Sequence, residues 1–178
     1  VDKTAEEKRV IIDNALDKWI SAMLGASKAY VKAWDVVNEP MSDWPDPTKL
    51  KTGVGKTLAA DEFYWQDYLG KDFSVRAIQL ARQYGNASDI LFVNDYGLEG
   101  ADQKKCLGLI DYVKYIETKG VKVDGIGTQM HVTLGETTIE GIRAMFTNLA
   151  ATGKLIKVSE LDMGIKPAGS TASLKTAD

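Results

Sequence analysis

Residues 34–40 read WDVVNEP, and this short stretch is the first indication of the fold. The run from Val31 to Val37 is rich in aromatic and β-branched residues, which predicts a strand buried on both faces. Pro40 ends the strand because proline cannot donate a hydrogen bond to a neighbouring strand. The residue at the end of this buried strand is therefore a glutamate, Glu39.

The succession of a helix and an apolar strand occurs four times along the chain. The expected strands cover residues 31–37, 90–93, 125–132 and 155–161, and the expected amphipathic helices cover residues 8–24, 71–84, 102–118 and 138–151. This alternation predicts an α/β protein with a parallel sheet buried on both faces and with helices packed outside it. Residues 41–58 carry prolines and glycines and predict a long loop, which in compact domains is usually functional.

The composition is that of a globular protein and argues against several classes of function. The 178 residues are 44% hydrophobic, and the formal net charge of -3 gives no basic surface for nucleic acid. The longest apolar runs are far shorter than the roughly 20 residues that cross a bilayer. One cysteine, Cys106, and one histidine cannot form a structural zinc site, and Cys106 is expected to be a small buried apolar side chain.

Polar side chains follow every one of the four expected strands. They are Asn38 and Glu39, then Asn94, Asp95 and Tyr96, then Gln129 and His131, and finally Glu160 and Asp162. The carboxyl ends of parallel strands meet at one edge of the sheet, and active sites of such folds lie there. The sequence therefore predicts one site built from the four strand ends.

Each of these residues also has a simpler explanation. Asn94 and Asp95 favour turns, so a turn explains them as well as a function does. Glu39 has no special role in turns, and Glu160 is expected inside an apolar strand, where an unpaired charge is costly. A solitary histidine is usually structural, but the position of His131 between the two glutamate strands predicts a hydrogen-bond partner that holds one carboxylate ionised.

Two carboxylates across a cleft can perform three kinds of chemistry. They can bind a divalent cation, share a proton for peptide cleavage, or divide the roles of acid and nucleophile on a glycoside. A metal site would need more converging oxygen ligands than this set offers. Amides, an imidazole and the aromatic side chains of Tyr96, Trp44 and Trp65 accompany the carboxylates, which favours a sugar substrate.

Four motifs, in this order and spacing, resemble those of glycoside hydrolase family ten, the endo-1,4-β-xylanases. The motifs are WDVVNEP at residues 34–40, LFVNDYGLE at 91–99, VDGIGTQMHV at 123–132 and VSELDMG at 158–164. Asn-Glu-Pro alone occurs in many related barrel glycosidases, whereas the four motifs together are specific. The likeness covers nearly the whole chain.

By that resemblance, Glu39 is the general acid/base and Glu160 is the nucleophile of a retaining double displacement. Glu39 protonates the glycosidic oxygen while Glu160 attacks the anomeric carbon, and Glu39 then deprotonates the water that releases the glycosyl-enzyme. The two carboxyl groups should lie about 5–5.5 Å apart. The charge of Glu160 is expected to raise the pKa of Glu39. The chemistry uses no metal or organic cofactor.

The resemblance also implies residues that bind the sugar. Asn38 would hydrogen-bond the 2-hydroxyl of the sugar being cleaved, and Tyr96 matches an aromatic residue on the leaving-group side. Gln129 and His131 match positions that contact the nucleophile or that sugar. The supporting positions are Asp162 near His131, together with Asn94 and Asp95.

The implied fold is a (β/α)8 TIM barrel, of which residues 1–178 would form a partial catalytic domain. Four strands, the fourth to seventh in the family's order, are about half of a complete barrel. Residues 166–178, KPAGSTASLKTAD, predict a loop. A truncated chain, a barrel split by an inserted domain and a partial sequence remain open. The open sheet is expected to associate with the rest of its barrel or with a second copy, and to be weakly active or inactive alone.

The expected substrate is xylan or a xylo-oligosaccharide. Secretion, or a cell-surface or periplasmic location, is expected because the polymer does not readily enter a cell. One alternative is a carbohydrate-binding fragment that performs no chemistry. Another is a related barrel glycosidase that acts on β-1,4-glucan, against which the strings GIGTQMH and SELD argue.

Overall fold

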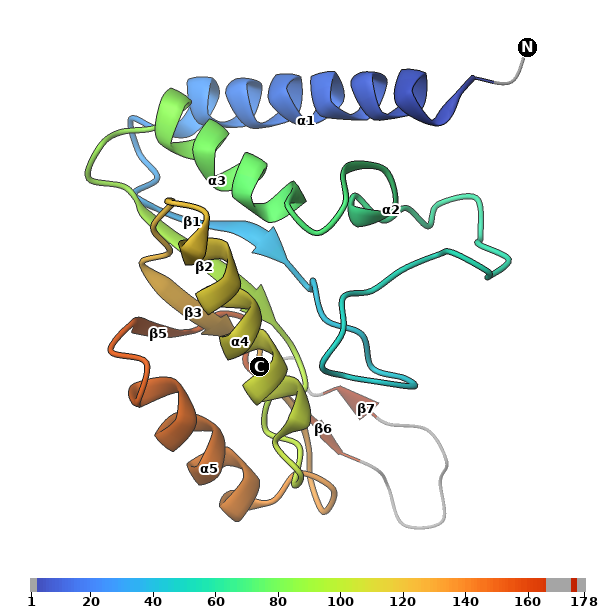
Figure 1. Cartoon of the computed structure of the whole chain (residues 1–178). Helices are drawn as coiled ribbons and strands as arrows, with labels where there is room; N and C mark the ends of the chain where they lie inside the picture. Colours follow the sequence, from blue (N-terminus) through green and yellow to red (C-terminus); the bar gives the residue numbers. More distant parts are fainter. Residues whose placement is uncertain (1–2, 166–173, 176–178) are drawn as a thin grey trace.

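The computed structural model describes residues 3–165 and 174–175 (Figure 1). Its helices are α1 (Ala5–Ser27), α2 (Gln66–Leu69), α3 (Phe73–Tyr84), α4 (Lys104–Thr118) and α5 (Ile139–Ala150). Its strands are β1 (Ala33–Asn38), β2 (Ile90–Asp95), β3 (Gly125–Thr128), β4 (His131–Thr133), β5 (Leu155–Val158), β6 (Asp162–Ile165) and β7 (Leu174–Lys175).

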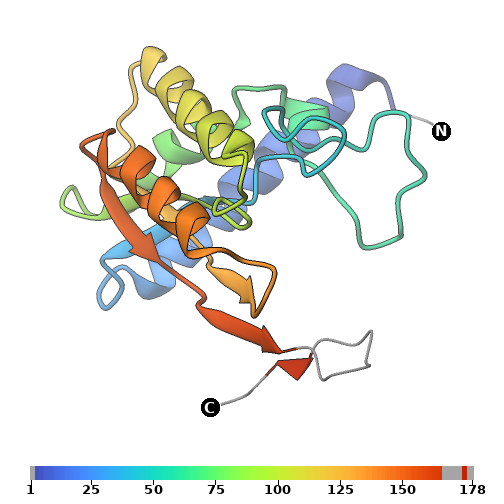
Figure 2. The ribbon, with the colours of Figure 1, turned by 90° about the horizontal axis from the view of Figure 1, so that it is seen from below.

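The centre of the fold is a four-stranded sheet with the order β1-β2-β3-β5, and every pair in it is parallel. A helix connects each strand to the next, as parallel pairing requires. The helices α1 and α3 pack on one another, and α4 and α5 lie side by side (Figure 2). The predicted parallel α/β sheet is confirmed, and within the described residues it does not close into a barrel.

Helix α1 shows how the sequence sets the position of an element. Thr4 and Glu7 form a capping box at its start, in which each side chain binds the other residue's backbone N–H. Leu16, Ile20 and Leu24 are spaced four residues apart and are buried on one face. Helix α1 packs against α3 and α2, and these three side chains belong to the core.

Two of the expected strands are shorter in the structure than predicted. The segment 125–132 divides into β3 and β4, because Met130 adopts a left-handed backbone with φ of 60°. In the segment 155–161 the strand β5 ends at Val158, and β6 begins four residues later. The strands β4 and β6 then pair in a second, smaller sheet with β7. The interruptions lie where the predicted site residues are found.

Burial also differs between the strands. β2 and β3 are buried along nearly their whole length, as expected for strands with neighbours on both sides. β1 and β5 are partly exposed, so the prediction that all strands are buried on both faces is wrong for them. The reason is their position, because each is an edge strand of the described sheet.

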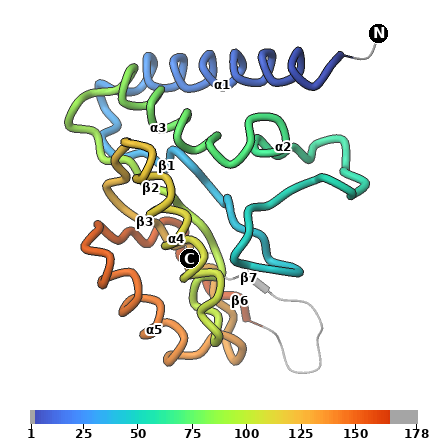
Figure 3. Tube along the Cα trace, in the orientation of Figure 1, coloured from blue at the N-terminus to red at the C-terminus, as the bar shows by residue number. Residues whose placement is uncertain are grey.

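The long loop after β1 is longer than predicted and contains a folded-back segment (Figure 3). It runs from Glu39 to Trp65, the residue before α2, instead of ending at residue 58. Met41 and Leu50 form an antiparallel bridge, and the Ser42 N–H donates to the Lys49 carbonyl over 2.8 Å. Residues 41–50 therefore return the chain to the end of β1.

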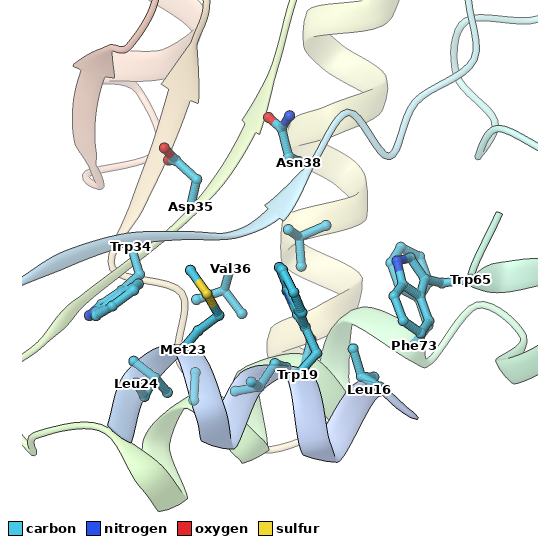
Figure 4. Close-up of a pocket in the computed structure, with 14 residues that line it drawn as sticks. Leu16, Trp19, Met23, Leu24, Trp34, Asp35, Val36, Asn38, Trp65 and Phe73 are labelled. Carbon is cyan, nitrogen blue, oxygen red and sulfur yellow. The ribbon is translucent and has the colours of Figure 1, made fainter. Parts of the chain in front are cut away.

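An apolar groove with a volume of about 310 Å³ lies between α1 and β1 (Figure 4). Trp19 and Met23 of α1 face Val36 of β1 across it, and Trp65 lies at one end. Trp19 is 62% exposed, although it lies on the side of α1 that meets the sheet. Trp65 therefore lines this groove, whereas the sequence associated it with the carboxylates.

On the opposite side of β1, an ion pair joins the two edge strands. Lys157 Nζ of β5 lies 2.6 Å from each carboxylate oxygen of Asp35 on β1 and 4.8 Å from the centre of the Phe92 ring. Gly125 makes room for Phe92, since a Cβ there would lie 2.1 Å from the ring. The Asp35–Lys157 ion pair thus spans β2 and β3, on the face of the sheet opposite the helices.

The predictions for the chain's end and for Cys106 meet different outcomes. Of the loop expected over 166–178, residues 166–173 and 176–178 lie outside the described part. Residues 174–175 form β7 rather than a loop.

Cys106 is fully buried in the core as predicted, and burial raises its pKa to about 11. No described helix is long and apolar enough to cross a membrane.

Candidate active site

Glu39 follows directly after β1 and has an unusual backbone. Its φ of 54° lies in the left-handed region, which costs a non-glycine residue on the order of 1–3 kcal/mol. Its N–H still donates to the Asn94 carbonyl over 2.8 Å, so pairing with β2 continues to this point. The turn redirects the chain at the strand end, and such strain is typical of functional sites.

Both carboxylate oxygens of Glu39 accept a hydrogen bond. Gln129 Nε2 donates to Oε1 over 3.0 Å, and Lys51 Nζ donates to Oε2 over 3.0 Å. Partial burial raises the pKa of Glu39, but the hydrogen bonds from Gln129 and Lys51 and the positive charge of Lys51 outweigh it. The pKa of this carboxyl is therefore held below its usual range. The expected raised pKa is wrong for the protein without substrate, because a lysine and an amide face this group.

A chain of side-chain amides connects the two predicted catalytic carboxylates. Gln129 Nε2 donates to Asn38 Oδ1 over 3.3 Å as well as to Glu39. Asn94 Nδ2 donates to Asn38 Oδ1 over 2.9 Å and to Glu160 Oε1 over 3.2 Å. The amides thus fix the positions of both carboxylates at once.

Gly127 explains how Asn94 can take this position. Asn38, Asn94 and Gly127 are register partners on adjacent strands. A Cβ on Gly127 would lie 2.1 Å from Asn94 Oδ1, so only glycine leaves space for the asparagine side chain. Ser159 Oγ, beyond β3, donates to the same Oδ1 over 2.9 Å.

Glu160 lies in the bend between β5 and β6, and its side chain is 43% exposed. The prediction that it sits inside an apolar strand is wrong, because β5 ends two residues earlier. His131 Nε2 lies 3.3 Å from Glu160 Oε2, and His131 Nδ1 lies 3.0 Å from Asp162 Oδ1. The hydrogen bond to Asp162, the charge of Asp162 and the contact with Glu160 raise the pKa of His131.

A buried polar cluster supports the Glu39 side of the site. Asp95 is fully buried, and its carboxylate accepts from the backbone N–H groups of Met41 and Tyr96, each over 2.9 Å. Lys105 Nζ of α4 lies 3.2 Å from Asp95 and 2.7 Å from Asp43. The Tyr96 hydroxyl donates to Asp43, and Lys105 lies 3.5 Å from the centre of the Tyr96 ring. This cluster ties Met41 and Asp43, which follow Glu39-Pro40, to the end of β2 and to α4.

All nine predicted site residues lie at one end of the sheet, but in two roles. Seven of them form the connected set around the carboxylates or touch it: Asn38, Glu39, Asn94, Gln129, His131, Glu160 and Asp162. Asp95 is buried and binds the backbone N–H groups of Met41 and Tyr96, and the Tyr96 side chain lies beside Asp43 and the two lysines.

The sequence did not single out Lys51, Asp43, Lys105 or Ser159. Lys51 and Asp43 belong to the loop that was predicted to be functional as a whole, and that was the only signal for them. Lys105 reaches the site from the second residue of α4, which a periodicity pattern cannot show. Ser159 stands beside Glu160 in the motif, where it could have been noted.

This arrangement offers one carboxylate on each side of an amide-lined centre. Glu39 and Glu160 follow different strands, β1 and β5, and have different partners, a lysine for one and an imidazole for the other. Within residues 3–165 and 174–175, no group of three or more His, Cys, Asp or Glu side chains could hold a metal ion. The fold and site define a half-barrel α/β protein with a divided pair of carboxylates, as glycosidases use.

Comparison with known proteins supports the same class. The model of glycosyl hydrolase family 10 matches residues 1–178. The chain is 36% identical over 82% of its length to endo-1,4-beta-xylanase C of Paenibacillus barcinonensis. It is 31% identical over 92% of its length to endo-1,4-beta-xylanase A of Halalkalibacterium halodurans. The crystal structure of xylanase B from Clostridium stercorarium F9 superposes on 94% of the chain with a TM-score of 0.79 and 28% identity.

The chain belongs to glycosyl hydrolase family 10. It spans 13% and 37% of the two curated relatives and 46% of the Clostridium stercorarium structure, so it holds about half of the family's TIM barrel. The predicted family and fold class are confirmed. The roles of the individual site residues stay predictions.

Proposed function

We propose that this chain carries the catalytic centre of a retaining endo-1,4-β-xylanase, with Glu39 as acid/base and Glu160 as nucleophile. The observation that supports this most directly is the amide chain of Gln129, Asn38 and Asn94 between the two carboxylates. It joins two glutamates that follow separate strands, β1 and β5, in one network. The three relatives reported above are named xylanases, which supports xylan as the substrate class.

In the first step, Glu160 attacks the anomeric carbon and the bond to the leaving sugar breaks. Glu39 transfers its proton to the departing oxygen, and in this proposal Asn38 hydrogen-bonds the 2-hydroxyl of the sugar being cleaved. In the second step, ionised Glu39 takes a proton from water, and the hydroxide attacks the same carbon and frees Glu160. Two inversions at one carbon give net retention.

Two variants distinguish the roles of the glutamates in the full-length protein that contains this chain. Glu39→Ala should lose xylan hydrolysis but keep a fast first step on an aryl xyloside, because a good leaving group needs no proton. Glu160→Ala should lose both reactions. The matched control is Glu140→Ala on the exposed start of α5, which should keep both.

The proposal fails if Glu160→Ala retains xylanase activity or if the products have inverted configuration. Product configuration is read by proton NMR of the first sugars released. A comparison of xylan with β-1,4-glucan tests the substrate class separately.

The open sheet supports a second candidate, a carbohydrate-binding fragment without turnover. β1 and β5 each pair on only one side among the described residues, so groups from other strands would be needed to complete the site. We infer that the chain alone is weakly active or inactive and that its partner is the rest of its barrel or a second copy. Normal turnover of xylan by the purified 178-residue chain would contradict this. Secretion, or a surface or periplasmic location, remains part of the proposal and is tested by fractionation of the producing cells.

A further inference from the structure

Lys51 lies far along the loop from Glu39 in sequence, yet the backbone brings the two residues together. The Met41–Leu50 bridge folds the loop back, and the Lys51 N–H donates to the Pro40 carbonyl over 2.8 Å. The Gln66 side chain donates to the Lys51 carbonyl from α2. The backbone of Lys51 is therefore held from both sides, beside the strand end that carries Glu39.

The side chain of Lys51 points to the carboxylate. Its Nζ lies 3.0 Å from Glu39 Oε2 and 4.7 Å from the centre of the Tyr96 ring, and the side chain is only 19% exposed. A lysine withdrawn from water interacts more strongly with a carboxylate than an exposed one does. Gln129 occupies the other oxygen, so the two donors together fix the orientation of Glu39.

We infer that Lys51 is a positioning residue that holds the Glu39 carboxylate ionised and in place between turnovers. The inference rests on the proposed function, in which Glu39 needs a proton for the first step and must be ionised for the second. The Lys51 ammonium group, 3.0 Å from Glu39 Oε2, favours the ionised form of Glu39. It therefore assists the second step, in which ionised Glu39 takes a proton from water. It also sets the pH above which Glu39 has no proton to give in the first step.

Other titratable groups face Glu39 and its surroundings from neighbouring elements. Lys105 of α4 acts on Glu39 in the same direction as Lys51, but its closest contacts are Asp43 and Asp95. Tyr96 stands at the end of β2 with its hydroxyl bound to Asp43. On the far side of the amide chain are Glu160, His131 and Asp162. Of the two lysines, only Lys51 donates to Glu39 itself, so its replacement isolates the effect.

The experiment compares three variants of the full-length protein over a range of pH. Lys51→Met removes the charge and keeps the chain length, Lys51→Arg keeps the charge, and Lys56→Met removes an exposed charge from the same loop. For kcat/KM on a xylo-oligosaccharide, Lys51→Met should move the alkaline limb to higher pH. In Lys51→Arg and in Lys56→Met the alkaline limb should stay at its wild-type pH. At pH values above the wild-type limb, kcat/KM of Lys51→Met should exceed that of the wild type by about fivefold. This factor corresponds to an ion pair that contributes about 1 kcal/mol.

A second readout does not depend on turnover. Carbon NMR of the side-chain carboxyls, assigned with Glu39→Gln, follows the titration of Glu39 directly in each variant. The pKa of Glu39 should rise in Lys51→Met and not in Lys56→Met, and Lys51→Gln replaces Lys51→Met if that variant folds poorly. An unchanged Glu39 titration overturns the inference, whatever the activity. A shifted titration in a protein that never hydrolyses xylan supports the role of Lys51 and rejects the proposed function.

Discussion

At the scale of single residues, His131 makes folding sensitive to pH. Its pKa is raised, first by the hydrogen bond to Asp162, so the folded state favours the imidazolium form. The stabilisation is complete below the pKa of an unfolded histidine, about 6.5, and is lost as the pH rises through the raised folded value. Urea unfolding at several pH values should show this loss for the wild type and not for His131→Asn. Equal pH dependence of the two proteins would contradict the prediction.

Gly127 is the residue whose replacement should damage the site most without touching a carboxylate. In Gly127→Ala the new methyl group would overlap Asn94, which must move and release Asn38 and Glu160. A misplacement of about 1 Å can cost on the order of 100-fold in rate, so kcat/KM on xylan should fall by about that factor.

The matched control is Gly25→Ala in α1, where a Cβ would meet nothing within 4 Å. It should leave activity unchanged and should stabilise the helix by about 0.5–1 kcal/mol. A Gly127→Ala variant with wild-type kinetics would show that Asn94 does not need this space.

The sequence predicted these residues to different extents for physical reasons. Glu39, Asn94, Gln129 and Glu160 could be predicted together because parallel strands end at a common edge. Lys51 could not, because its contact with Glu39 depends on how many residues the loop uses to turn back. The exposure of Glu160 was also hidden, since an apolar string does not show where a strand stops.

At the scale of elements, the contact of α4 with the strand ends depends on Lys105. Its side chain is 7% exposed and pairs with the fully buried Asp95, so Lys105→Met leaves a buried carboxylate without its cation. Loss of one partner from such a pair costs about 3–5 kcal/mol of unfolding free energy. Urea unfolding measures the change.

The neighbouring Lys104 provides the control, because it pairs with Asp102 at the exposed start of the same helix. Lys104→Met should change the unfolding free energy by about 1 kcal/mol at most. The double variant Asp95→Asn with Lys105→Met should recover part of the loss. If Lys104→Met and Lys105→Met had equal effects, the cluster would not stabilise the fold.

The four long helices and the alternation of helix and strand along the chain followed from periodicity, and the helix bounds were close to those predicted. The short helix α2 was not predicted. The division of the third and fourth strands did not follow, because a positive φ at Met130 depends on the neighbours and not on its side chain. The exposure of β1 and β5 was likewise invisible, since an apolar strand looks the same at an edge as at a centre.

At the scale of the whole molecule, the apolar groove should make the isolated chain associate. Val36 lies on an edge strand and lines the groove together with Trp19. Sedimentation velocity of the 178-residue chain should show a mass that rises with concentration. Val36→Lys should reduce the rise, because a charge on an edge strand opposes pairing. The control is Leu134→Lys at an exposed turn, and a monomer at every concentration would contradict the prediction.

The Asp35–Lys157 ion pair has a consequence for how such a barrel is completed. In a flat sheet the two outer strands would lie about 14 Å apart, so their direct contact shows that the sheet curls toward the face of the pair. The curvature is thus built into this half. The remaining strands of the barrel would pair with the edges of a sheet that is already curved, so their pairing would not have to bend it.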